Sequence, residues 1–413
     1  MTTFHRKQVW RRLLFTAAII GILCFCFSGC SEEKPHPAAS EARQNPGSKE
    51  TPQQIRIIDG NGEEITVHKP VERIVAEYMN NAELLRILKK SDKVVGVSGL
   101  AHIFEKCRSQ FPEFRKKPSV GYFWNLDYEA ILDMKAELLL TFGPNVSEKK
   151  ENLPGVDVVF LGLYYPDLIN PAESRFIRGV RNLGEILDAQ EQAEAYINWH
   201  VGLIGRITSR TEKLPEDKKP KVFIAQANAP ILDTTAYSTY PRKDTLTQAC
   251  IIAGGKSIAA ELPEYAKQGT GIQVDPEWLI IQNPDIMILH AVDRVDMYGY
   301  EADDITEVRK SLNRFLERPE LVNVKAVKNG KVYIFDGHFR NDASGGVLGA
   351  AYMAKIFHPE LFADMDPEAI HQEYLGMQEL DYDVNQHGIF LYPPLEAGGS
   401  LIGIPDSYKG RIF

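Results

Sequence analysis

Two short stretches share part of the pattern of enzyme motifs, but neither motif is complete. Gly-Gly-Lys-Ser at 254–257 ends like a phosphate-binding loop, yet the glycine required five residues before Gly255 is Cys250. Ser-Glu-Lys-Lys at 147–150 has the Ser-x-x-Lys spacing of a nucleophilic serine, but no Ser-Asp-Asn or Lys-Thr-Gly motif follows it. Gly-x-Ser-x-Gly and Gly-x-Gly-x-x-Gly do not occur. We therefore expect that the protein is not an enzyme, and we predict no catalytic residue.

The ten histidines and five cysteines form no metal-binding pattern. No His-x-His, His-Glu-x-x-His or Cys-x-x-Cys spacing occurs, so we predict no metal site made of protein ligands. Beyond the first 30 residues only Cys107 and Cys250 remain. A disulfide between them and two buried free thiols are both open.

Tyrosine, tryptophan and arginine side chains are the remaining candidates for binding a small molecule. Aromatic faces suit flat or bulky ligands, and an arginine can bind carboxylate or phenolate oxygens through two hydrogen bonds. The candidates follow predicted strands or stand in the loop before residue 126; they are Tyr78, Tyr122, Trp124, Tyr164, Tyr165, Tyr237, Tyr240, Arg294 and Arg340. We predict that they line one site for a bulky ligand with anionic oxygens.

The elements that must position these residues alternate between strand and helix patterns. Short segments rich in Val, Ile and Leu predict strands at 73–77, 93–97, 136–141 and 157–161. Helical patterns lie between them, for example at 81–90 and 128–134, and a hairpin over 54–67 turns at 59–62. This alternation predicts an α/β fold with parallel sheets, in which ligands bind beyond the carboxyl ends of the strands.

One pattern occurs twice, 148 residues apart. Residues 126–140 align without a gap on residues 274–288, and residues 73–77 fall on 221–225 at the same offset. The repeat predicts two similar α/β lobes. Between them, a helix over 189–212 is expected to be about 36 Å long, and such a strut favours a small rocking motion over wide closure.

The first 30 residues resemble a bacterial lipoprotein signal. Four basic residues precede an apolar run of 15 residues at 13–27, which is short for a bilayer span of about 20 residues. The run ends in Phe27-Ser-Gly-Cys30, so Cys30 is predicted to receive the lipid. A plain signal peptide, or a short anchor with an incidental cysteine, is the alternative. Residues 31–52 contain no Ile, Leu, Val, Met or aromatic residue and are expected to form a tether of about 25 Å.

The charge of the chain argues against nucleic acid as a partner. The 413 residues include 47 Lys and Arg against 56 Asp and Glu, a net charge of −9, and four of the basic residues lie in the signal. Nucleic-acid binding needs a basic face, which this balance does not predict.

Several segments, in their order and spacing, resemble the substrate-binding proteins of ABC importers for iron-siderophores, haem and cobalamin. The first-lobe segments are Lys69-Pro-Val-Glu-Arg-Ile-Val, Lys93-Val-Val-Gly-Val, Ser119-Val-Gly-Tyr and Asn125-Leu-Asp-Tyr-Glu-Ala-Ile-Leu. The second-lobe segments are Gly254-Gly-Lys-Ser-Ile, Val274-Asp-Pro-Glu-Trp-Leu and Val327-Lys-Asn-Gly-Lys-Val-Tyr. The segment Ala354-Lys-Ile-Phe-His-Pro-Glu-Leu-Phe-Ala-Asp is typical of the iron-complex branch. The resemblance covers about residues 54–382.

The resemblance implies two α/β lobes joined by a long helix, with one ligand in the cleft between them. It implies a metal chelate such as a ferric siderophore, with cobalamin or haem as alternatives, and an ABC permease with its ATPase subunits as partners. We expect no cofactor, a monomer, and an extracytoplasmic protein held at a membrane by its lipid. An extracytoplasmic enzyme or a surface sensor on the same scaffold is the alternative of another class. The expected organisation is signal 1–29, tether 30–52, first lobe 53–171, connecting helices 172–214, second lobe 215–382 and a tail of unassigned role at 383–413.

Both copies of the repeat contain Asp-x-Glu at the predicted start of a helix. Asp127 and Asp275 are expected to be helix N-caps, and Glu129 and Glu277 favour the positive end of each helix. In the family that the sequence resembles, the matching glutamates pair with arginines of the permease. The resemblance therefore implies a docking role for Glu129 and Glu277, which is compatible with their place in the helices.

Stable anchoring needs more than one acyl chain, and Cys30 is the residue predicted to carry them. Replacing Cys30 with Ser should therefore remove the anchor and leave the protein soluble outside the cytoplasm. Fractionation and intact mass of the mature protein measure this. An unmodified N-terminus at another position would contradict lipid anchoring.

Overall fold

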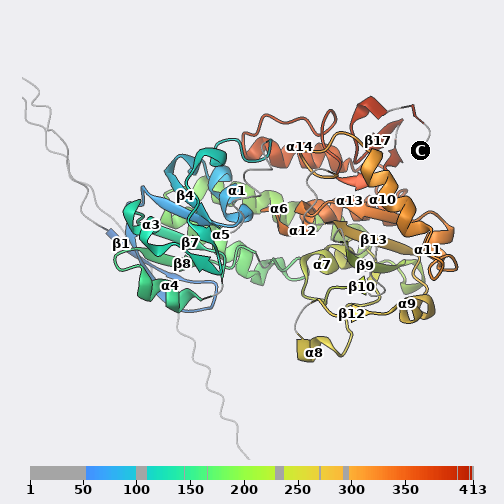
Figure 1. Ribbon diagram of the computed structural model, residues 1–413, viewed down its shortest axis with the longest axis horizontal. Coiled ribbons are helices and arrows are strands. Elements are labelled where there is room, and N and C mark those ends of the chain that lie inside the picture. The colour runs from blue at the N-terminus through green and yellow to red at the C-terminus, as the bar shows by residue number, and fades with distance from the viewer. Residues whose placement is uncertain are drawn as a thin grey trace, which may run out of the picture. The chain divides into compact units, whose positions relative to one another are not determined.

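The structure is a computed structural model that describes residues 53–98, 109–143, 145–164, 166–227, 237–268, 271–291, 297–397, 399–408 and 410–411. These residues belong to one compact unit, which contains two α/β lobes (Figure 1). The predicted fold class is confirmed. None of the helices in these described stretches combines the length and the hydropathy needed to cross a membrane.

The first lobe is built on a four-stranded parallel sheet with the order β4-β3-β7-β8. Its strands are β3 (Ile74–Glu77), β4 (Val94–Ser98), β7 (Leu138–Thr141) and β8 (Asp157–Phe160). They agree within two residues with the strands predicted from the sequence, because strands buried on both faces are continuously apolar. The lobe also contains the hairpin of β1 (Gln53–Ile58) and β2 (Glu64–Lys69) and the helices α1 (Met79–Ile87), α3 (Tyr128–Asp133) and α4 (Val146–Asn152).

The second lobe repeats this strand order and adds one strand. Its sheet has the order β11-β9-β13-β14-β15, and the first four strands are parallel. The strands are β9 (Lys221–Ala227), β11 (Lys256–Ser257), β13 (Ile286–Ala291), β14 (Val332–Phe335) and the antiparallel β15 (Leu391–Tyr392). Strand β9 therefore occupies the place of β3, and β13 the place of β7, as the 148-residue offset predicts. The helices are α7 (Thr245–Ile252), α8 (Tyr265–Gln268), α9 (Pro276–Gln282), α10 (Thr306–Leu316), α11 (Lys325–Lys328), α12 (His338–Asn341), α13 (Val347–Phe357) and α14 (Pro367–Met377).

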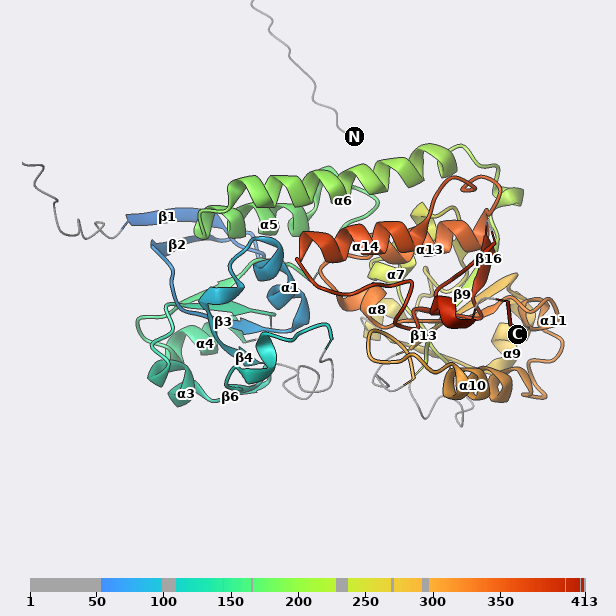
Figure 2. The same ribbon diagram turned by 90° about the horizontal axis from the view of Figure 1, so that it is seen from above.

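Two helices connect the lobes, α5 (Arg175–Ile186) and α6 (Gln190–Thr211). Helix α6 has 22 residues, about 33 Å at 1.5 Å per residue, and its buried side contacts α1 of the first lobe and α7 and α13 of the second. Figure 2 shows it running along both lobes. The predicted long helix at 189–212 is confirmed.

Buried polar contacts also join the lobes. The Glu83 carboxylate on α1 accepts hydrogen bonds from the Ala343 backbone N–H at 2.7 Å and from the Tyr374 hydroxyl at 3.1 Å. Arg86, one turn further along α1, donates to Gln378 at 3.0 Å. These bonds are buried, so separating the lobes at α1 would leave unpaired polar groups.

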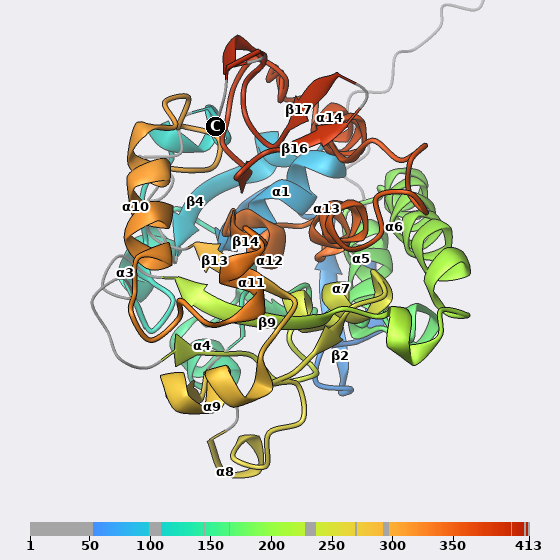
Figure 3. The same ribbon diagram turned by 90° about the vertical axis from the view of Figure 1, so that its right-hand side faces the viewer.

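The described residues of the tail, 383–397, 399–408 and 410–411, are part of the second lobe. Strand β15 extends the sheet, and β16 (Leu395–Ala397) and β17 (Ser400–Ile402) form a small hairpin beside α14 (Figure 3). Phe390, Leu391 and Ile402 are buried in the core shared with α13 and α14. The Gly403 N–H donates to the Glu368 carboxylate of α14 at 2.7 Å, which ties the tail to this helix.

Replacing Glu368 with Gln should make stability less dependent on pH. Burial, opposed by the Gly403 N–H and reinforced by neighbouring carboxylates, raises the pKa of Glu368 from 4.5 to about 8. Between these values the folded protein keeps a proton that the unfolded chain releases, so this group's contribution to stability is lost as the pH rises from 4.5 through 8. Gln keeps the acceptor for Gly403 without the charge. Thermal unfolding at pH 5 and pH 8 measures this. The free energy of unfolding of the variant, relative to that of the parent, should be about 1–4 kcal/mol higher at pH 8 than at pH 5. Equal pH slopes in both proteins would contradict the assignment.

Candidate ligand-binding site

Aromatic side chains of the first lobe form one continuous cluster, the aromatic wall. Its members are Tyr78, Tyr122, Phe123, Trp124, Phe142 and Tyr164. The Phe142 ring lies at the centre, with centroid distances of 4.3 Å to Tyr78, 5.0 Å to Phe123 and 4.9 Å to Tyr164. Tyr122 and Trp124 each stand 4.4 Å from Phe123 and extend the cluster outward. Since Trp124 is 60% exposed and Tyr122 40%, the wall presents aromatic surface at its outer end.

The first-lobe sheet brings these rings together. Tyr78 follows β3 directly and Phe142 follows β7, and these strands are neighbours. Tyr122 stands in the short hairpin of β5 (Gly121–Tyr122) and β6 (Asn125–Leu126). Gly121 allows this tight hairpin, since it has a φ of 86° and a Cβ there would lie 2.6 Å from the Asn125 carbonyl oxygen. The structure thus unites the predicted Tyr78, Tyr122, Trp124 and Tyr164.

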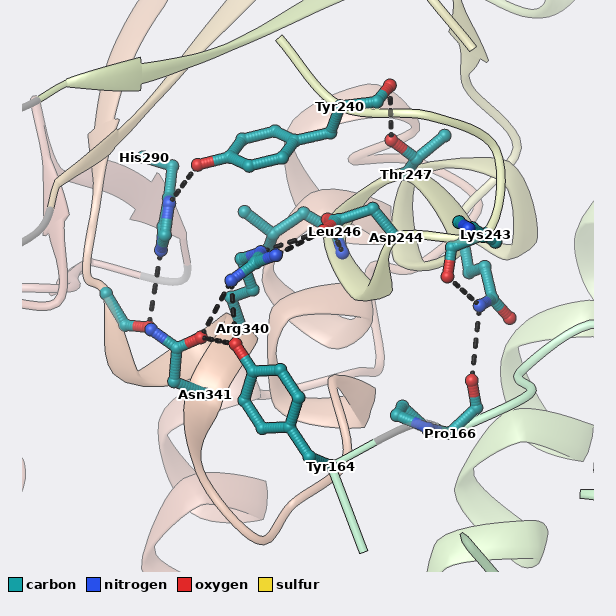
Figure 4. A network of polar contacts seen from close by, with 12 residues as sticks. Tyr164, Pro166, Tyr240, Lys243, Asp244, Leu246, Thr247, His290, Arg340 and Asn341 are labelled. Carbon is teal, nitrogen blue, oxygen red and sulfur yellow. Dashed lines mark hydrogen bonds and ion pairs between the residues drawn. The ribbon is translucent and has the colours of Figure 1, made fainter. Parts of the chain in front are cut away.

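A polar network crosses from the inner end of the wall to the second lobe (Figure 4). Arg340 on α12 donates from Nε and Nη2 to Asp244 Oδ2, at 2.9 and 2.6 Å. Its Nη1 donates across the lobe boundary to the Tyr164 hydroxyl at 2.8 Å, and to Asn341 Oδ1 at 3.0 Å. The Tyr164 hydroxyl in turn donates to Asn341 Oδ1 at 2.7 Å. The Arg340 guanidinium also lies over the Tyr240 ring, 5.0 Å from its centroid.

The charge states of Arg340 and His290 follow from their surroundings. Burial alone lowers the pKa of Arg340, but its contacts with Tyr164 and Asp244 outweigh burial and raise it. Burial and the nearby Arg340 lower the pKa of His290 to about 3, so His290 is neutral. Its Nε2 must donate to the Gly337 carbonyl, at 3.3 Å, which leaves Nδ1 to accept from the Tyr240 hydroxyl at 2.8 Å. Arg340 is therefore a permanent cation beside a neutral His290.

A cavity of about 750 Å³ opens beside the network, between the segment after β8 and the start of α7. Its charged lining residues are four cations and three carboxylates: Arg175, Arg242, Lys243, Arg340, Asp167, Glu173 and Asp244. Gln248 holds the two sides together, since its amide accepts from the Leu168 N–H at 2.8 Å and donates to the Pro166 carbonyl at 3.2 Å. The volume is within the range of about 300–1,000 Å³ that is usual for small-molecule sites. Tyr164 and Arg340 line this cavity and also belong to the wall or the network, so all three features form one site.

The remaining predicted binding residues are placed differently. The Tyr237 side chain is fully buried in the second-lobe core, where its hydroxyl accepts from Arg318 at 2.7 Å. This corrects the expectation for Tyr237, because a ring without exposed surface cannot contact a ligand. Tyr165 and Arg294, like the lipidation residue Cys30, lie outside the described residues. Cys250 is a buried free thiol, and Cys107 lies outside the described residues as well.

Two residues of the network were not expected from the sequence, Asp244 and Asn341. Asp244 caps α7, since its Oδ1 accepts from the Leu246 N–H at 3.0 Å while Oδ2 binds Arg340. An aspartate in front of Thr245-Leu246 is an N-cap signal that could have identified it. Asn341 follows Arg340 and carries no comparable signal.

The two predicted docking glutamates occupy equivalent, exposed positions. Glu129 is in the first turn of α3 and Glu277 in the first turn of α9. Asp127 and Asp275 cap these helices, with hydrogen bonds of 2.9 Å to the Ala130 N–H and 2.8 Å to the Trp278 N–H. The predicted caps are confirmed. Across the described parts of the chain, no group of three or more His, Cys, Asp or Glu side chains is arranged to hold a metal ion.

Comparisons with known proteins agree with this architecture. Residues 74–338 match the family model described as periplasmic binding protein. An uncharacterised ABC transporter substrate-binding lipoprotein, YvrC of Bacillus subtilis, is 20% identical over 366 residues, which is 87% of this chain and 99% of that protein. The TroA-like periplasmic binding protein FepB from Veillonella parvula has a TM-score of 0.66 at 20% identity, covering 82% of this chain and 99% of its own. The molybdate-binding protein MolA of Haemophilus influenzae has a TM-score of 0.61 at 17% identity, covering 79% and 98%. Since the family model spans most of both lobes, the chain belongs to the periplasmic binding protein family.

Proposed function

We propose that this protein is the extracytoplasmic substrate-binding component of an ABC importer and captures a bulky, anionic metal chelate of the ferric siderophore type. One observation carries the ligand class: an aromatic wall from the first lobe ends on the Arg340 cation of the second lobe, beside a cavity of about 750 Å³. Rings would contact the organic shell of the chelate, and cations would face its oxygen donors.

The size of the site argues against a bare oxyanion. Molybdate, the ligand of MolA, is a single metal atom with four oxygens and needs no aromatic surface. A chelate would be large enough to fill a cavity of about 750 Å³ and to contact both Tyr164 and Arg340 in its lining. Haem, a flat ring with two carboxylates, and cobalamin are the alternatives of the same class.

The proposal includes a lipid anchor at Cys30 and a permease partner. Glu129 and Glu277 stand on matching helices of similar lobes, so a partner with two equivalent basic contacts would fit both at once. The ligand would bind between the lobes without turnover.

Titration of the secreted Cys30→Ser protein with a ferric tris-catecholate, haemin, cobalamin and molybdate should show tightest binding of the ferric chelate. Replacing Arg340 with Met should weaken that binding at least tenfold, because losing one partner of a desolvated charge pair costs about 2–5 kcal/mol. Arg294→Ala should act in the same direction, and neither change should affect cobalamin as strongly. Tryptophan fluorescence is the readout of these titrations. Trp124→Phe should remove most of the fluorescence change that ligand binding causes.

Two further variants serve as controls for this titration. The double variant Arg340→Met/Asp244→Asn avoids leaving a buried carboxylate unpaired, and Tyr237→Phe changes a ring that the core encloses. The first should remain weak in binding although it is folded, and the second should bind normally. If none of the four ligands binds, or if Arg340→Met binds as tightly as the parent, the proposed ligand class is wrong.

Replacing both Glu129 and Glu277 with Ala should impair uptake far more than either change alone, with ligand affinity unchanged. An exposed ion pair is worth about 0.2–1 kcal/mol, so one lobe's contact can partly compensate for the other. Glu191→Ala is the matched control, since Glu191 is also an exposed glutamate in the first turn of a helix, α6. Ligand uptake by cells and ligand affinity of the purified variants are the measurements. A loss of ligand affinity in the double variant would contradict a docking role.

A further inference from the structure

A fully buried ion pair lies directly behind the aromatic wall. The side chains of Glu77 and Lys149 are 0% and 1% exposed. The Lys149 ammonium donates to both Glu77 oxygens, at 2.8 and 2.9 Å, and to the Thr141 hydroxyl at 2.8 Å. Glu77 Oε2 also accepts from the Thr141 hydroxyl and from the Phe142 N–H, each at 2.8 Å. Every charge in this cluster therefore has hydrogen-bonding partners, as buried charges require.

The pair ties together the ends of two neighbouring strands. Glu77 is the last residue of β3 and Thr141 the last residue of β7. The next residue in each case belongs to the wall: Tyr78 follows Glu77, and Phe142 follows Thr141. Their rings are stacked at 4.3 Å with an interplanar angle of 27°. The cluster therefore sets the spacing at which the two rings meet.

Tyr78 also has a strained backbone. Its φ is 70° and its ψ is 157°, a combination that residues other than glycine rarely adopt. It is the only residue between β3 and α1, and its N–H donates to the Ser98 carbonyl at 3.0 Å. All nine residues of α1 are buried, so the chain on both sides of Tyr78 is fixed. The turn needs this backbone angle, and glycine would adopt it more easily, but glycine would not supply a ring.

We infer that Glu77 and Lys149 are positioning residues of the ligand site, which hold Tyr78 in its strained conformation and in register with Phe142. The inference rests on the proposed function in that the wall contacts the ligand. Stability alone gives little reason for such a pair, because buried ion pairs can often be replaced by apolar residues without loss of stability. The pair does supply directional bonds from β3 to β7 and α4, and apolar side chains could not.

The first test replaces the pair by neutral residues of similar size, Glu77→Gln/Lys149→Met. The near-ultraviolet circular dichroism of the stacked rings should lose most of its intensity, and the Kd for a ferric tris-catecholate should rise at least tenfold. Both are measured well below the unfolding temperature. Leu138→Ala is the matched control, because Leu138 is a fully buried β7 residue whose side chain belongs to the core on the face of the sheet opposite Thr141, so its truncation lowers stability away from the cluster. The control should keep both the dichroism and the affinity.

The second test measures the backbone of Tyr78 without any ligand. Tyr78→Gly and Tyr78→Ala both remove the ring, but only glycine relieves the positive φ, so the glycine variant should unfold about 2–4 °C higher. In the Glu77→Gln/Lys149→Met background this difference should shrink, because the turn is no longer held.

The two tests separate the inference from the proposed function. If the double variant keeps the ring dichroism and the full Gly–Ala difference, the positioning role is overturned, whatever the protein binds. If the dichroism collapses while the parent binds no ferric chelate, the positioning role stands and the proposed ligand is wrong.

Discussion

Arg340 carries a charge that contacts both lobes at the site. Taking a guanidinium out of water is costly unless it is paired, and Asp244 of the same lobe meets that requirement with two short hydrogen bonds. The third nitrogen, Nη1, donates to Asn341 of the same lobe and to the hydroxyl of Tyr164 in the other lobe. Tyr164 is also the inner end of the aromatic wall. The Arg340 guanidinium therefore lies at the boundary between the rings of the first lobe and the cations of the second. The cavity beside it takes its chemical character from that junction.

The sheets and the long helix follow closely from local sequence. Strands such as Leu138–Thr141 are buried on both faces, which makes their sequence continuously apolar and easy to recognise. The caps Asp127 and Asp275 act within three residues, so their helices begin where a sequence pattern predicts. The tail shows the limit of such reasoning. Strand β15 is two residues long, too short for a period, and its place depends on pairing with β14 and on the bond from Gly403 to Glu368.

The site residues were predictable where they directly follow the carboxyl end of a parallel strand. Tyr78 and the inner ring Tyr164 follow parallel strands of the same sheet, and the carboxyl ends of such strands converge. Tyr237 fails this rule because it belongs to β10 (Tyr237–Ser238), a two-residue strand paired with β12 (Gln273–Val274) outside the main sheet. Nothing in the sequence distinguishes a tyrosine that packs inward from one that lines a site. The pair Glu77–Lys149 was not predictable either, because its members are 72 residues apart and charged side chains are usually exposed.

The connection between the lobes has a consequence for how copies of the protein compete for the permease. Helix α6 and the buried bonds of Glu83 and Arg86 join the lobes, and we expect them to resist wide separation. The loaded and the empty protein would then present nearly the same outer surface. If this protein serves an importer as proposed, empty copies compete with loaded copies for the same permease. When the permease sites are saturated, the import rate would follow the fraction of protein that carries ligand. Producing more of the protein when ligand is scarce would then slow uptake.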